Sequence, residues 1–132
     1  MAMSVAFNPA DRILTVRVSD RLTGEQWQAA QRAAADRLKE WSADIRVLVI
    51  VEADFAGWDR RAGAWDESPF QSRFDRQTAR MAIVGQKKWE DLVLMFVGKG
   101  LRRVEIEYFQ PADVAGARQW LIAAAAREGD AS

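Results

Sequence analysis

The chain has 132 residues, of which 49% are hydrophobic, 29% charged and 10% aromatic, a composition typical of one globular domain rather than a disordered chain. Nineteen basic and nineteen acidic side chains balance to a net charge of zero, which argues against a nucleic-acid-binding surface. Cysteine and histidine are both absent. Their absence excludes disulfides, thiol nucleophiles, Cys/His metal sites and histidine acid–base catalysis, so we expect neither an enzyme nor a metal or cofactor.

The chain shows no pattern for membrane insertion. The longest apolar run, residues 120–126, has seven residues, whereas a spanning helix needs about 20. No charged-then-apolar leader opens the sequence. We therefore expect no transmembrane segment and a cytoplasmic location.

The first elements are a β-hairpin and a helix. Residues 3–7 and 13–18 are rich in apolar and β-branched side chains and flank the turn formers Asn8 to Asp11, which predicts two antiparallel strands. In the second strand the Leu14 side is the expected core side. Thr23 and Gln26 have the spacing of a capping box, and the apolar spacing that follows predicts a helix over residues 24–41.

Three further strands and two further helices are expected. Residues 45–51 are almost continuously apolar, as in a strand buried on both faces, and residues 81–84 form a similar strand closed by Gly85. Residues 103–109 alternate apolar and acidic side chains, which favours a place near a sheet edge. Residues 87–97 and 111–127 have helical spacing, the latter with a buried stripe at Val114, Ala117, Leu121 and Ala125.

The order β-β-α-β-α-β-α-β-α predicts an α/β fold in one domain over residues 1–132. We expect a mixed, mostly parallel five-stranded sheet with helices packed on it, in which the first hairpin strand is the antiparallel member.

Residues 55–74 form the first candidate site because they hold five aromatic side chains after the end of the central strand, where α/β sheets bind ligands. One interpretation is an aromatic lid or cleft for an apolar ligand or a partner. The other is core packing by short helices that cap the sheet. The residues concerned are Phe55, Trp58, Trp65, Phe70 and Phe74.

A second candidate surface lies in the predicted helix over residues 87–97. Its apolar face does not include Leu94, Met95 and Val97, so these three side chains make the helix hydrophobic almost all round. Such a helix is either deeply buried or presents an apolar patch to a protein partner or a second copy, as in a homodimer.

Other chemical patterns are weaker. Four acidic residues could be imagined as paired carboxylates, but no spacing brings two of them together, and surface charges or helix caps are the preferred interpretation. Two basic pairs in a neutral chain fall short of an electrostatic track. The acidic residues are Asp54, Asp59, Asp66 and Glu67, and the basic pairs are Lys87-Lys88 and Arg102-Arg103.

Several segments together resemble the SpoIIAA-like family of small bacterial proteins, which is related to STAS domains. They are Asp54-Phe55-Ala56-Gly57-Trp58 after the central strand, residues 81–85 leading into Lys87-Lys88-Trp89-Glu90, then Glu107-Tyr108-Phe109, and the stretch from Ala115 to Leu121. The resemblance covers almost the whole chain and implies a mixed sheet with packed helices.

The resemblance implies an interaction module whose biochemical role is poorly defined. Regulatory STAS domains carry a phosphorylatable Ser or Thr after the central strand, but residues 52–58 contain no hydroxyl side chain and Ser68 comes too late. Relatives often have an acidic residue where Gln110 stands. We therefore expect a non-catalytic module that acts through protein–protein contacts, with a carrier of a small apolar lipid or acyl chain as the alternative.

Overall fold

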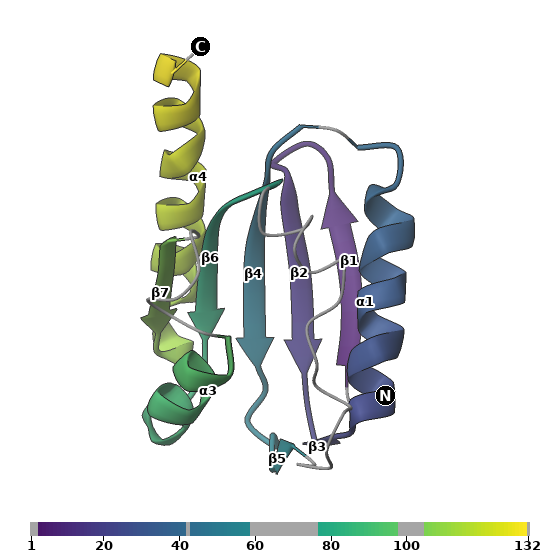
Figure 1. Cartoon of the computed structure of the whole chain (residues 1–132). Coiled ribbons are helices and arrows are strands. Elements are labelled where there is room, and N and C mark those ends of the chain that lie inside the picture. Colours follow the sequence, from purple (N-terminus) through teal and green to yellow (C-terminus); the bar gives the residue numbers. More distant parts are fainter. Residues whose placement is uncertain (1–2, 42, 59–76, 98–104, 132) are drawn as a thin grey trace.

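A computed structural model describes residues 3–41, 43–58, 77–97 and 105–131 and contains the predicted five-stranded sheet (Figure 1). The sheet order is β1-β2-β4-β6-β7. Strand β1 runs antiparallel to β2, and every other neighbouring pair is parallel. The mixed, mostly parallel α/β sheet expected from the sequence is therefore confirmed. The strands are β1 (Met3–Asn8), β2 (Ile13–Val18), β4 (Ile45–Val51), β6 (Thr78–Val84) and β7 (Glu105–Phe109).

The turn between β1 and β2 is held by its own polar side chains. The Asn8 side chain accepts from the Ala10 amide at 3.0 Å, and the Asp11 carboxylate accepts from the Ile13 amide at 3.1 Å. Such local bonds are the reason that Asn and Asp favour turns. Arg46, which is almost fully buried, donates from its guanidinium to the Asp11 carbonyl and from its backbone to the Arg12 carbonyl. The first turn is thereby attached to the central strand.

Helix α1 (Gly24–Leu38) begins with the predicted capping box. The Gln26 amide donates to Thr23 Oγ1 at 3.2 Å, and the Thr23 amide donates to the Gln26 side chain at 2.9 Å. The helix ends three residues before the predicted Trp41, because the Trp41 amide turns back to the Leu38 carbonyl. The Trp41 ring packs edge-on against Phe7, with 5.1 Å between the ring centroids.

Two further helices cover the sheet. Residues 87–97 form a 3-10 turn, η1 (Lys87–Trp89), followed by α3 (Glu90–Val97). Residues 111–131 form η2 (Pro111–Asp113) and α4 (Val114–Ala131), whose C-terminal part extends beyond the amino-terminal ends of β6 and β7 in Figure 1. Ala117 and Leu121 are fully buried as predicted. Val114 is exposed instead, because it lies in the first turn of α4, at the margin of the sheet.

The sheet has a separate core on each face. On one face, α1 and α3 cover side chains of all five strands, including Leu14, which confirms the expected core side of β2. On the other face, α4 packs on β4, β6 and β7. Ile13 is buried in this second core, so β2 contributes to both faces at its start. Among the described residues, α1 and α3 therefore lie on one face of the sheet and α4 lies on the other.

Candidate functional site

The loops that follow β2 and β4 lie side by side at the carboxyl ends of these strands (Figure 1). They form a short parallel pair, β3 (Arg21–Leu22) and β5 (Gly57–Trp58), which the sequence analysis missed. The Ala56 amide donates to the Asp20 carbonyl at 2.9 Å and adds to this pairing. Gly57 has a φ of 100°, a conformation that only glycine adopts without strain. Gly57, six residues after the end of β4, was the available signal for this turn.

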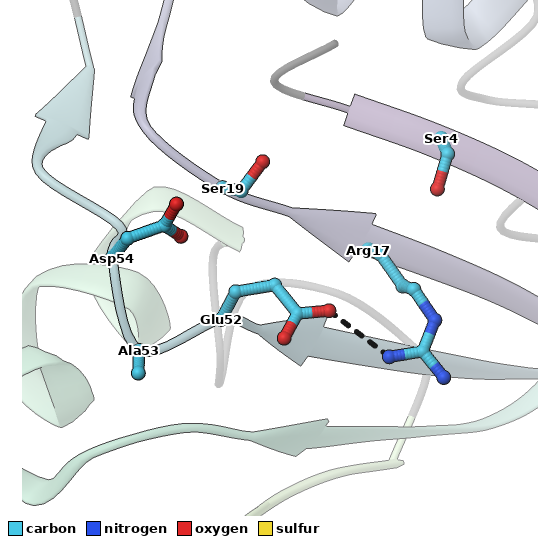
Figure 2. Close-up of a pocket in the computed structure, with 6 residues that line it drawn as sticks. All are labelled: Ser4, Arg17, Ser19, Glu52, Ala53 and Asp54. Atoms are coloured by element: carbon cyan, nitrogen blue, oxygen red, sulfur yellow. Dashed lines mark hydrogen bonds and ion pairs between the residues drawn. The ribbon is translucent and has the colours of Figure 1, made fainter.

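Beside these loops the sheet has a hollow of about 530 Å³, which we call the polar shelf (Figure 2). Ser4 comes from β1 and Arg17 from β2, and the two residues are opposite each other in the strand register. The rest of the shelf follows the ends of β2 and β4. Its lining residues are Ser4, Arg17, Ser19, Glu52, Ala53 and Asp54.

The shelf is open because α4 covers only part of its face of the sheet. Helix α4 packs on β4, β6 and β7 and reaches β2 only at Ile13, so among the described residues β1 and the rest of β2 have no helix on this side. The side chains there are small or polar: Ser4, Ala6 and Arg17 are exposed and Thr15 is half-buried. The carboxyl end of parallel strands is also where α/β sheets usually place ligands.

The shelf carries one ion pair and one further acid. Arg17 Nη1 lies 3.0 Å from Glu52 Oε1, and these side chains are 53% and 37% exposed. Water and salt screen such a pair, so it adds little to the stability of the fold. Asp54 is exposed nearby, and Figure 2 shows its carboxylate on the Ser19 side of the hollow. The arrangement offers donors and acceptors to a polar partner at a small desolvation cost.

Tyr108 is the one tyrosine in the chain and lies at the end of β7. Its hydroxyl donates to the Gln86 carbonyl at 2.6 Å. Burial, with a smaller contribution from the negative charge of Glu90, raises the pKa of Tyr108 to about 12. The phenol therefore stays protonated at neutral pH and serves as a hydrogen-bond donor rather than as a base.

The predicted aromatic site divides into a described and an undescribed part. Phe55 is only 6% exposed and packs edge-on against Trp89, with 4.8 Å between ring centroids. For this residue the structure matches the core-packing interpretation. The backbone of Trp58 lies in β5, while its side chain is outside the described part of the structure. Trp65, Phe70 and Phe74 lie outside the described residues altogether, as do Asp59, Asp66 and Glu67.

The second predicted surface belongs to α3. Leu94 is partly buried and packs against the core under α1 and α3. Met95 and Val97 lie in the same helix, and their side chains are outside the described part of the structure. The shelf was not expected from the sequence, because its polar residues come from three separate segments and carry no spacing motif.

Comparison with known proteins identifies the class to which the chain belongs. The family model for SpoIIAA-like proteins matches residues 13–122. The fold is similar to a crystal structure of an uncharacterised DUF3478-family protein with a SpoIIAA-like fold from Shewanella loihica PV-4. The TM-score is 0.68 at 21% sequence identity, over 91% of this chain and 92% of that one. No curated protein matches the sequence.

The chain is thus a member of the SpoIIAA-like family. The segments on which the resemblance rested meet in space: Phe55 and Gly57 contact Trp89, Gly85 lies against Tyr108, and Phe109 packs on Trp120. Within the described ranges, no three acidic side chains gather where they could hold a metal ion. Nor does any helix there have the length and apolar character needed to cross a membrane.

Proposed function

We propose that this SpoIIAA-like protein is a non-catalytic cytoplasmic binding module that acts through protein–protein contacts, and that a partner docks on the polar shelf. The observation that carries the proposal is the half-open sheet face. Within the described ranges, α4 leaves β1 and the part of β2 after Ile13 uncovered on its side, and the shelf lies beside this uncovered part. A hollow of about 530 Å³ lined by exposed polar side chains suits contacts with another protein surface.

The chemistry of the described side chains supports binding rather than catalysis. The Tyr108 hydroxyl is occupied by the Gln86 carbonyl, and its raised pKa keeps it protonated. Glu52 is paired with Arg17 at 3.0 Å, so it is engaged in an ion pair on the surface. The chain has no histidine or cysteine that could take over proton transfer or nucleophilic attack.

Two surfaces expected from the sequence are kept as further proposed contacts. They are the aromatic segment 55–74 and the helix surface that includes Leu94, Met95 and Val97, the latter for self-association as a homodimer. The alternative function, a carrier or sensor of a small apolar ligand held between the sheet and segment 55–74, stays a prediction. The shelf does not favour it, because its lining is polar.

The test compares matched charge reversals. Affinity capture from host-cell extract is carried out with the wild-type chain, with Asp54→Arg on the shelf, and with Asp36→Arg on the exposed side of α1 as the control. We expect a protein that the wild type and the control retain and Asp54→Arg loses. The captured protein is then purified and titrated against all three chains by calorimetry. A partner that binds all three equally would remove the shelf from the proposal, and no stoichiometric protein partner would refute the function.

A further inference from the structure

The free edge of β7 has an arrangement suited to strand addition. In the described part of the structure β7 pairs only with β6, so it forms one edge of the sheet. The opposite edge strand, β1, packs against α1 (Figure 1). An edge strand presents unpaired backbone donors and acceptors, and a peptide can extend the sheet by pairing with them.

The backbone groups available on this edge can be identified. The Phe109 carbonyl accepts from the Gly85 amide, so it points toward β6. In a parallel ladder the inward-facing residues alternate with outward-facing ones. Glu105, Glu107 and Phe109 therefore face β6 with their backbone, whereas Ile106 and Tyr108 direct their N–H and C=O groups away from the sheet.

The side chains of β7 define what kind of strand fits. Glu105 and Glu107 are exposed and two residues apart, so they share the α4 side of the sheet. Arg80 Nε lies 3.5 Å from Glu105 Oε2. Glu107 is in register with Ala82, which is fully buried and uncharged, so β6 supplies no cation beside it. Strand β6 therefore supplies a cation to Glu105 but not to Glu107.

We propose that the β7 edge binds an extended protein segment with Lys or Arg at alternate positions. The basic side chains lie opposite Glu105 and Glu107, where cross-strand pairs of opposite charge are favourable. The intervening residues of the segment lie on the other side, beside Ile106 and Tyr108, and apolar side chains suit them. Antiparallel pairing of β7 with a second copy places glutamates opposite each other when it is centred on Ile106 or Glu107, so these registers are disfavoured.

The inference rests on the proposed protein-binding function and adds a partner chemistry to it. The probe is a fluorescent peptide, acetyl-TKVKVT-amide, which has two lysines on one face of a strand. Its control is acetyl-TEVEVT-amide. Anisotropy titrations use the folded full-length wild type, Glu107→Lys, and Glu25→Lys on the exposed side of α1 as the matched charge control.

We expect the lysine peptide to bind the wild type and Glu25→Lys equally, to bind Glu107→Lys about tenfold more weakly, and to bind less well at high salt. Hydrogen exchange should slow at the Ile106 and Tyr108 amides when the peptide is bound. No binding, equal binding to Glu107→Lys, or self-association of the wild type through β7 would overturn the inference. In each of these cases the capture experiment with Asp54→Arg still decides the protein-binding function separately.

Discussion

The contact between Gly85 and Tyr108 provides the sharpest test of how this fold is held together. A methyl group at Gly85 would lie 2.5 Å from Tyr108 Oη and 3.1 Å from Val51 Cβ. Both distances are shorter than van der Waals contact allows. The Tyr108 hydroxyl cannot rotate away freely, because it donates to the Gln86 carbonyl at 2.6 Å. Gly85→Ala therefore forces either the ring or the strand end to move.

The expected magnitude follows from two opposing effects. Forcing an extra methyl group into a packed core costs about 1–3 kcal/mol. Gly85 does not have a positive φ, so alanine is compatible with its backbone conformation. Alanine also lowers the conformational entropy of the unfolded chain, which stabilises the folded state by about 0.4–1 kcal/mol. We expect Gly85→Ala to lower the free energy of unfolding by about 1–2 kcal/mol.

A double-mutant cycle isolates the contact. Tyr108→Phe removes the hydroxyl and its hydrogen bond, which alone costs about 0.5–1.5 kcal/mol. In that background the new methyl group no longer meets Oη, so the cost of Gly85→Ala should fall by about 1 kcal/mol. Urea unfolding followed by circular dichroism measures all four proteins.

The control is Gly116→Ala in α4, where the methyl group would meet the Asp113 carboxylate. This carboxylate ends a flexible side chain and can move, while alanine in place of a helical glycine gains about 0.5–1 kcal/mol. Gly116→Ala should therefore be close to neutral. Strictly additive effects of Gly85→Ala and Tyr108→Phe, or a Gly85→Ala protein as stable as the wild type, would refute the reasoning.

Further predictions concern the ionisation of Tyr108, the cap of α1 and the core under α4. Because Tyr108 is the only tyrosine, phenolate absorbance should give a single titration with a pKa of about 12; a midpoint near the usual value would contradict its burial. Because the pKa of Tyr108 is higher in the folded state than in the unfolded state, the protonated phenol contributes its full stabilisation below the unfolded pKa of about 10, and this contribution is lost as the pH rises toward 12. Tyr108→Phe should therefore lose less stability than the wild type between these pH values. Thr23→Ala removes the α1 cap and should lower the free energy of unfolding by about 1 kcal/mol. The control Gln28→Ala, at an exposed position inside the same helix, should be neutral. Leu121→Ala, at a fully buried position, should cost about 2–5 kcal/mol, while Ile122→Ala, at a position 51% exposed, should change the midpoint of thermal unfolding little.

The elements with strong local signals could be predicted from the sequence. The capping box identified the start of α1, and the almost continuous apolar run of residues 45–51 identified the central strand with its observed bounds. The alternation in β7 indicated its place at an edge. Each of these signals is local: it depends on residues within one element and on the burial that the element requires.

Features that depend on contacts between distant segments were missed. The β3–β5 pair has only two residues in each strand, too few for a periodic pattern. The shelf joins Ser4, Arg17 and Asp54, which meet only because β1, β2 and β4 are neighbours in the sheet. Val114 fits the apolar spacing of α4, but it is the first residue of that helix and lies at the margin of the sheet. Periodicity alone therefore predicted a buried side chain where the structure has an exposed one.

The polar character of the shelf follows from how little of its face α4 covers. Five strands about 4.8 Å apart span about 19 Å, whereas one helix with its side chains is about 10 Å wide. In the part of the chain that the structure describes, α1 and α3 lie on one face, and α4 covers about half of the other. Residues on the uncovered half must remain compatible with water, as Ser4, Ala6 and Arg17 are. A partner that docks there replaces water around charged groups rather than burying an apolar surface. Its affinity should therefore fall with rising salt, and a partner bound equally well at low and high salt would have to occupy a different surface.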